Sequence, residues 1–366
     1  MVHQYRKPAH LLVTASILGL FLLMMTACSG GTATASSTGG TATASSTGST
    51  ATASSASSLN STLFNTSGGA GAGKYQFRTL NDNADPTFNQ LLGINNHGVI
   101  AGYFGSGAVV NGNLHPNKGY TLSQPYGQRN YTNENFPGSV QTQVTALNNA
   151  GYTAGFWVDK AGNNFGFIRW QGGFTSYKDP HTGKSNGVQV NQLLGLNDKG
   201  IAVGFYTDSN GNDHAYILDQ NKGKFSEIPT SHIPGAVSAM ATGINNNGDV
   251  VGTYTDANGA THGFLLKGNS ISVFDYTGVA NVTSTVFLGV NSYDQIVGSY
   301  TVGTGNAAQM HGLLLSNPLN HAQWQTVDDP QGVGTTTING LNDHADLVGF
   351  YVDSQGNTDG LLALHP

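Results

Sequence analysis

Charged residues are scarce in this chain of 366 residues. It contains 14 Lys and Arg residues and 20 Asp and Glu residues, for a net charge of −6, and it has no basic block. Proteins that bind nucleic acids or anionic membrane surfaces do so largely through clustered Lys and Arg. The sequence therefore predicts no nucleic-acid partner, and no electrostatic attraction to a membrane surface.

The sequence also has a single cysteine, Cys28, and lacks the common catalytic signatures. One cysteine allows neither an intrachain disulfide nor a redox pair. We find no Gly-x-Ser-x-Gly elbow and no phosphate-binding loop. Glycoside cleavage needs two carboxylates that face one bond, and the only glutamates are Glu134 and Glu227. The sequence leaves open whether the chain is an enzyme. If it is, the better candidates for catalytic carboxylates are those that do not recur in every repeat: Asp82, Asp179, Asp213 and Asp329.

The N-terminal segment has the layout of a secretory signal. Arg6 and Lys7 precede an apolar run from Leu11 to Met25, and small residues follow before Cys28. The run is shorter than the ~20 residues of a membrane-spanning helix. The sequence "MTAC" resembles the lipobox of bacterial lipoproteins, although Met25 stands where that box usually has Leu. This resemblance implies a signal peptide at 1–27, lipidation of Cys28 and a cell-surface or periplasmic location. The alternative is an uncleaved signal anchor.

Residues 28–73 are rich in Ser, Thr, Ala and Gly. They include three nine-residue units that begin at Thr32, "TATASSTGG TATASSTGS TATASSASS". A segment of this composition has little apolar surface to bury, so we predict a disordered, solvated linker. The folded domain is then expected at 74–366.

The rest of the chain consists of six copies of one repeat. Each copy opens with a triplet that ends in Asn, and successive copies begin 53, 49, 48, 46 and 51 residues apart. A glycine follows nine residues after the start of each triplet, and an aromatic residue follows two residues later. The six triplets are Gly93-Ile94-Asn95, Ala146-Leu147-Asn148, Gly195-Leu196-Asn197, Gly243-Ile244-Asn245, Gly289-Val290-Asn291 and Gly340-Leu341-Asn342.

We predict four short β-strands in each repeat. No segment after Gly73 has the sustained period of a helix. Asn-Asn-x-Gly and Asp-x-x-Gly sequences supply tight turns between the strands. Four strands per ~50 residues favour a β-propeller over a sandwich or a solenoid. The last repeat lacks a fourth strand, and "KYQFRTLNDNADP" resembles the fourth strands of other repeats. We therefore predict an all-β, six-bladed propeller whose last blade is completed by residues 75–80.

The segment "GINNNGDVVGTYTDANGATHGFLL" resembles the bacterial extracellular repeat family named HAF, after the His-Ala-Phe of its third strand. The corresponding positions in this chain are His214-Ala215-Tyr216, His262-Gly263-Phe264 and His311-Gly312-Leu313. The resemblance covers residues 93–366 and is weaker in the first, second and sixth repeats. It implies secretion and repeat architecture, and no particular activity.

The propeller topology places the Asp-x-x-Gly turns and the variable linkers between repeats on one face. Binding sites often develop in variable loops on a fixed scaffold. We therefore take this face as the candidate binding surface. Its candidate residues are Asp159, Asp208, Asp256, Asp353, Trp157, Tyr206, Tyr254 and Tyr351. The aromatic residues could stack on sugars, or they could pack between blades.

The sequence is compatible with two kinds of metal site. His214, His262 and His311, with Asp359 at the same position of the last repeat, could hold a transition metal if they converged. The alternative is a structural hydrogen bond made by each histidine to a neighbouring loop or blade. The Asp-x-x-Gly aspartates could bind calcium, or they could simply cap their own turns. No cofactor is otherwise indicated.

Together these patterns predict a secreted, lipid-anchored propeller that acts as a binding or scaffold module. Its polar, weakly charged composition suits neutral glycans or a surface protein, and we expect a monomer that meets the membrane only through its lipid anchor. The alternatives are an extracellular lyase or hydrolase with a site at the loop face of the channel, and purely structural display.

Overall fold

The repeats fold into four-stranded antiparallel β-sheets in a computed structural model that describes residues 75–110 and 112–366. The signal peptide, the linker and the lipidation site at Cys28 were predicted within 1–74 and lie outside the described residues. The described part has no α-helix. Within it we also find no helix that is both long and apolar enough to cross a membrane.

Each of the six blades has four strands, counted from the channel outward. Blade 1 contains β2 (Asn89–Ile94), β3 (Ile100–Phe104), β6 (Lys118–Leu122) and β7 (Tyr131–Asn133); blade 2 contains β8 (Gln141–Leu147), β9 (Thr153–Val158), β10 (Asn164–Trp170) and β11 (Gly173–Tyr177); blade 3 contains β12 (Asn191–Leu196), β13 (Ile201–Thr207), β14 (Asp213–Asp219) and β15 (Lys224–Glu227).

The second half of the ring repeats this arrangement. Blade 4 contains β16 (Ala236–Ile244), β17 (Val250–Asp256), β18 (Thr261–Lys267) and β19 (Ser270–Phe274); blade 5 contains β20 (Val282–Val290), β21 (Ile296–Val302), β22 (Gln309–Ser316) and β23 (Gln323–Thr326); blade 6 contains β24 (Thr336–Leu341), β25 (Leu347–Val352), β26 (Thr358–Leu364) and β1 (Gln76–Thr79). Blades 4 and 5 are joined into one eight-stranded sheet by a single parallel pair, Thr261 and Ser284.

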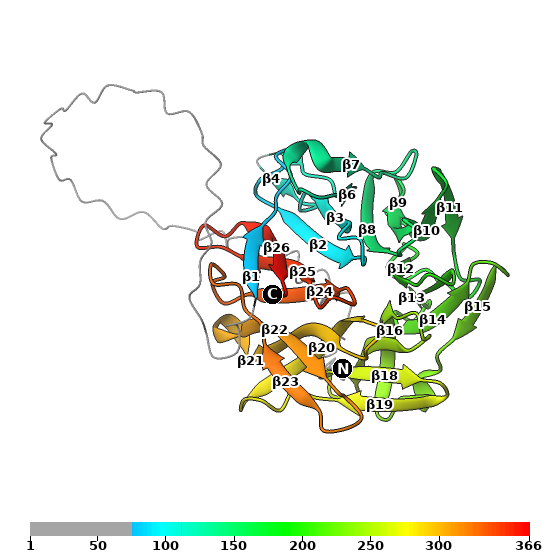
Figure 1. Cartoon of the computed structure of the whole chain (residues 1–366). Helices are drawn as coiled ribbons and strands as arrows, with labels where there is room; N and C mark the ends of the chain where they lie inside the picture. The colour runs from blue at the N-terminus through cyan, green and yellow to red at the C-terminus, as the bar shows by residue number, and fades with distance from the viewer. Residues whose placement is uncertain (1–74, 111) are drawn as a thin grey trace, which may run out of the picture.

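The blades are arranged in a ring (Figure 1), and residues of their innermost strands line a central channel. The innermost strand of each blade contacts the innermost strands of both neighbours, and β2 contacts β24. At the last blade, β1 pairs with β26 in the register Gln76–Leu364 to Thr79–Leu361, as the sequence predicted for residues 75–80. The first strand of the domain therefore covers the edge that β26 would otherwise expose.

A β-bulge in every innermost strand explains the glycine that recurs nine residues after each triplet begins. In blade 3 the pairing of β12 with β13 skips Leu194, and the other five inner strands have the same shift. The recurring glycine lies on the second strand next to the bulge. A Cβ on Gly204 would overlap the carbonyl oxygen of Gln192, so no larger residue fits there.

The skipped residues of the six bulges face the channel. They form one tier of its wall: Leu92, Thr145, Leu194, Thr242, Leu288 and Asn339. In five of the six blades a glycine follows the skipped residue, with Ala146 in blade 2, and these small residues let neighbouring inner strands approach closely. A Cβ on Gly243 would lie 3.1 Å from the Cα of Gly289 in the next blade.

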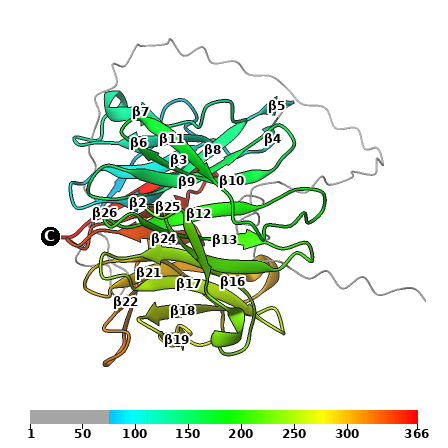
Figure 2. The ribbon, with the colours of Figure 1, turned by 90° about the vertical axis from the view of Figure 1, so that its right-hand side faces the viewer.

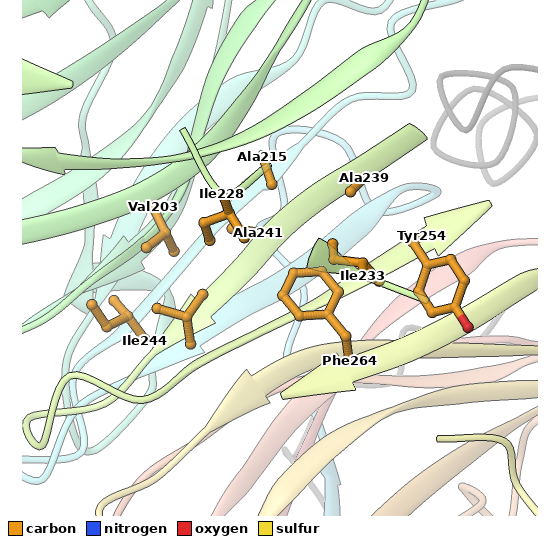
Figure 3. Close-up of a cluster of buried hydrophobic side chains, with 10 residues drawn as sticks. Val203, Ala215, Ile228, Ile233, Ala239, Ala241, Ile244, Tyr254 and Phe264 are labelled. Carbon is orange, nitrogen blue, oxygen red and sulfur yellow. The ribbon is translucent and has the colours of Figure 1, made fainter. Parts of the chain in front are cut away.

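The hydrophobic core lies between the blades rather than in one central cluster. The cluster between blades 3 and 4 is typical (Figure 3). Val203 and Ala215 from blade 3 pack against Ala241, Tyr254 and Phe264 from blade 4. Similar clusters join the other neighbours, so every blade is stabilised by burial of apolar side chains on both of its faces.

Irregular structure is concentrated on one end of the ring. We name this end the loop face; it carries the linkers between blades and the connections between second and third strands. The opposite end, the asparagine face, carries the hairpins between first and second strands. The connections on the loop face include the hairpin of β4 (Val109–Val110) and β5 (Asn113–Leu114), and the 3-10 helices η2 (Thr230–His232) and η3 (Gly305–Ala307); η1 (Gln128–Asn130) lies on the asparagine face.

Candidate functional site

The asparagine of each triplet joins its blade to the next one. The side-chain Nδ2 of Asn95 donates to the main-chain oxygen of Asn148 at 3.1 Å. The same contact continues through blades 2 to 5. It returns to the start when Asn342 donates to the oxygen of Asn95 at 3.3 Å. Six side chains thus form a closed circle of hydrogen bonds around the channel mouth.

The same asparagines also shape their own hairpins. The Oδ1 atom of Asn95 accepts the main-chain N–H groups of His97 and Val99, each at 3.0 Å. Asn95 is only 5% exposed. Because one amide satisfies main-chain groups of two blades, a shorter or charged side chain would leave buried polar groups without partners.

The next residue in the hairpin forms a second, incomplete ring of contacts, because its N–H donates to the corresponding side chain of the next blade at five of the six junctions. The N–H of Asn149 donates to Asp198 at 2.7 Å, and the N–H of Asp343 donates to Asn96 at 2.9 Å. The two aspartates lie in blades 3 and 6, on opposite sides of the ring. Asn149 and Asn246 donate their side-chain amides to Asp198. The carboxylate of Asp198 therefore already accepts three hydrogen bonds.

These two rings line a cavity of about 80 Å³ at the channel mouth. Its wall contains the six triplet asparagines and the residues that follow them, Asn96, Asn149, Asp198, Asn246, Ser292 and Asp343. The polar atoms largely satisfy one another across the blades. We interpret the hydrogen bonds at this mouth as contacts that close the ring. They thereby fix the geometry of both faces.

The loop-face aspartates cap their own turns. Asp159 accepts the N–H groups of Ala161 and Asn163 at 2.8 and 2.9 Å, and its second oxygen accepts the side-chain amide of Asn163. Asp208, Asp256 and Asp353 make the equivalent contacts. The turn-capping alternative accounts for all four carboxylates. That these four also contact a ligand stays a prediction.

The predicted aromatic contact residues are mostly inside the molecule. Tyr206, Tyr254 and Tyr351 are 4%, 5% and 1% exposed, and they pack between blades. Trp157 is half-buried and is stacked on Phe136, with ring centroids 4.4 Å apart. These rings therefore offer little face to a sugar in this conformation.

The third-strand histidines are held separately, each in its own blade. His214 stacks on Tyr206 with ring centroids 4.9 Å apart, and its nitrogens lie 3.1 Å from Glu227 and 3.3 Å from Asp208. His262 and His311 repeat this stacking on Tyr254 and Tyr300, and they bond to Asp275 and Asp328. The equivalent Asp359 accepts the side-chain amide of Asn81. Over the described residues, no three His, Cys, Asp or Glu side chains group as metal ligands.

Two unrepeated aspartates are buried acids with unusual proton affinity. Asp213 is fully buried, and burial raises its pKa from 3.8 to about 6. Thr207 donates to its Oδ1, but Oδ2 has no hydrogen-bond partner. Burial also raises the pKa of Asp329 to about 6. Asp213 lies near His214 and Asp208, whereas Asp329 lies near Asp359, so the two carboxyls do not form a catalytic pair.

A third unrepeated acid, Asp179, holds an imidazole at the surface of the loop face. Asp179 is 4% exposed, and its Oδ1 lies 2.9 Å from Nδ1 of His181, which is 73% exposed. A similar pair joins the buried Asp85 to His115 at 2.9 Å. Each carboxylate orients its imidazole so that Nε2 is the nitrogen left to contact a ligand. The fourth unrepeated acid, Asp82, accepts the N–H of Ala84 in an exposed turn.

Large exposed apolar side chains also gather in the loop-face connections. Val109, Leu114, Val237, Val279 and Val333 are between 45% and 67% exposed. From the sequence we placed the candidate site on this face but did not identify these apolar side chains or the two imidazole–carboxylate pairs. Three of the six linkers contain an Asp-Pro sequence, at Asp85, Asp179 and Asp329, and this was the available signal for the carboxylates of the pairs.

Comparison with known proteins gives distant structural likenesses only. No protein-family model and no curated protein matches the sequence. The chain is similar to a fungal lectin from Aleuria aurantia, described as a six-bladed β-propeller with a novel fucose recognition mode, at 14% identity over 74% of this chain and 89% of that chain (TM-score 0.44). It is also similar to a gluconolactonase from Xanthomonas campestris, at 10% identity over 81% and 92% (TM-score 0.46). These likenesses are too remote to assign a function.

Proposed function

We propose that this chain is a secreted, lipid-anchored binding module that holds a glycan or another cell-surface component on its loop face. The observation that carries the proposal is the contrast between the two faces. On the asparagine face, the hairpins between first and second strands have the same construction in all six blades. On the loop face, linkers range from seven residues (134–140) to 13 residues (178–190), and each differs from the others. A constant ring with variable loops is the usual form of a binding scaffold.

The chemistry of the loop face suits a neutral, hydroxyl-rich ligand. His181 and His115 present oriented imidazoles there, and exposed valines supply small apolar contacts elsewhere on the same face. A sugar offers both hydroxyl groups and C–H surface, so it can use both kinds of contact. Few Lys and Arg residues are available for an anionic ligand.

A glycan array and polysaccharide pull-down with the full chain test this proposal. We expect binding that falls tenfold or more, ~1.4 kcal/mol, in His181→Ala. The matched control is His97→Ala, which removes an exposed imidazole from the asparagine face and should leave binding unchanged. Absence of binding to any glycan or cell-wall material would contradict the proposal. Shortening of a polysaccharide during the assay would favour the lyase or hydrolase instead.

A further inference from the structure

A polar contact crosses the first two junctions between blades, near the loop face. Neighbouring blades lie side by side (Figure 2), so a residue at the beginning of the third strand meets a residue of the next inner strand. Between blades 1 and 2, the side-chain amide of Gln143 donates to Asn117 at 3.0 Å. Between blades 2 and 3, the amide of Gln192 donates to Asn164 at 3.1 Å. The inner strand thus supplies a hydrogen-bond donor at both junctions.

The junction between blades 3 and 4 has no such donor. The equivalent residues there are Asp213, the first residue of β14, and Met240 in β16, and both are fully buried. Met240 takes the place of Gln192, because its carbonyl oxygen lies against the recurring glycine of its own blade, Gly252. The N–H of Asp213 donates to Ser238 of the same strand at 3.0 Å. A thioether has no hydrogen to donate, and Oδ2 of Asp213 has no partner among the described residues.

Asp213 is also connected to the linker that presents His181. The hydroxyl of Thr207 donates to Oδ1 of Asp213 at 2.7 Å. The main-chain oxygen of Thr207 accepts the N–H of Gly183, and its own N–H donates to the main-chain oxygen of Val190, each at 2.9 Å. Gly183 and Val190 both belong to the linker between blades 2 and 3. One threonine therefore joins the buried carboxyl to two points of this linker.

The surroundings of Asp213 favour its neutral form. Burial raises its pKa from 3.8 to about 6; the carboxylate of Asp208 also raises it, whereas His214 and the hydroxyl of Thr207 lower it. The facing residues of β16 are uncharged, and the linker contributes the Asp179–His181 pair. An ionised carboxylate that is buried without a second donor is costly. Opening of the linker, which admits water to Oδ2, therefore becomes easier as pH rises through 6.

We propose that the protonation state of Asp213 is a switch that controls the linker between blades 2 and 3. The neutral carboxyl holds this linker, and with it His181, in the position that the structure shows, and the ionised carboxylate releases it. The switch regulates the candidate site on the loop face, and its effect on ligand binding rests on the proposed function. A ligand held through His181 is then bound more tightly in acidic than in neutral surroundings.

Substitutions of Met240 with and without a donor separate this switch from a simple packing effect. Met240→Gln has nearly the same length as the native side chain, and it restores the donor that Gln192 supplies at the previous junction. Met240→Leu keeps an apolar side chain and restores no donor. Asp213→Asn removes the titrating group and is an independent route to the same result. Each substitution would be made in the full chain.

Hydrogen exchange at pH 5 and pH 7, measured by mass spectrometry and corrected for intrinsic rates, reports how often the linker opens. In the native chain and Met240→Leu, we expect residues 178–190 to open about tenfold more often at pH 7, because the carboxyl regains its ordinary pKa when the linker opens. In Met240→Gln and Asp213→Asn, this increase should be lost. The hairpin 245–249 on the asparagine face is the internal control and should be the same in all four chains.

The same pH dependence in the native chain and in Met240→Gln would overturn the inference. A native linker that opens equally often at pH 5 and pH 7 would also overturn it, and this is the result expected if a bound water or ion already satisfies Oδ2. No ligand takes part in the experiment. Absence of glycan binding would therefore contradict the proposed function alone and leave the switch standing.

Discussion

A single asparagine, repeated six times, links local turn geometry to closure of the whole ring. Asn95 shows the two roles in one side chain, since its oxygen accepts two hairpin N–H groups while its nitrogen donates to the next blade. From the sequence we predicted only a turn residue at this position. The contact to the next blade could not be predicted, because it depends on how closely neighbouring inner strands approach one another.

Replacement of Asn95 should therefore destabilise the fold. Asn95→Ala removes all three contacts, and Asn95→Asp removes the donor to the next blade. We expect each to lower the free energy of unfolding by about 1–3 kcal/mol, because main-chain groups at a buried site lose their partner. Asn210→Ala, at an exposed turn position, is the control and should change stability by less than ~0.5 kcal/mol. Denaturant unfolding measures the stability of each variant. Asn95 variants as stable as the Asn210→Ala control would contradict this role of Asn95.

The buried carboxyl of Asp213 should make stability depend on pH. Its folded pKa is raised to about 6 from 3.8, so the folded protein holds this proton more tightly than the unfolded chain does. The contribution of this group to stability is then greatest below pH ~4 and falls as pH rises toward 6, by on the order of 2–3 kcal/mol. Asp213→Asn should remove that loss.

Unfolding at pH 4 and pH 7 measures the effect. Asp329 has a similarly raised pKa, so Asp329→Asn is the matched variant and the double variant should have the flattest pH dependence. A stability difference between pH 4 and pH 7 that is the same in Asp213→Asn as in the native chain would contradict the assignment.

At the scale of one blade, the β-bulge in the inner strand determines which residue the second strand can have beside it. Only glycine fits there. The sequence showed a glycine at a fixed spacing and predicted strands around it. The sequence alone did not explain the glycine, because a bulge can be recognised only from the register of the two paired strands. The bulge also turns one residue of each inner strand toward the channel, which alternation along the sequence does not reveal.

Gly204→Ala should be among the most damaging small substitutions in the chain. The added Cβ would meet the carbonyl of Gln192, and the strands would have to move apart. We expect a loss of about 2–4 kcal/mol in unfolding free energy. Gly173→Ala on the outer strand of blade 2 is the control, because its Cβ would lie 3.7 Å from the nearest atom. Similar losses at the two positions would contradict the explanation.

At the scale of the whole molecule, the sequence was informative about architecture and less so about the site. The triplet spacing predicted repeated four-stranded units, and the missing fourth strand of the last repeat predicted the partner of residues 75–80. The site residues were harder to predict, because the Asp, Tyr and His residues that recur in the repeats serve contacts within and between blades. The groups free to meet a ligand, such as His181, are outside the repeat.

The register between the first and last strands is the feature on which the ring and its two faces depend. Gln76 and Leu364 are direct partners on β1 and β26, and paired residues of antiparallel strands have Cα atoms ~4.5–5.5 Å apart, within the range of a disulfide. The decisive measurement is therefore disulfide formation in the variant Gln76→Cys, Leu364→Cys, made with Cys28→Ser. We predict that the folded protein forms this crosslink under mild oxidation and unfolds at a higher temperature than its reduced form. Two freely reactive thiols that remain uncrosslinked in the folded protein would contradict the closed ring.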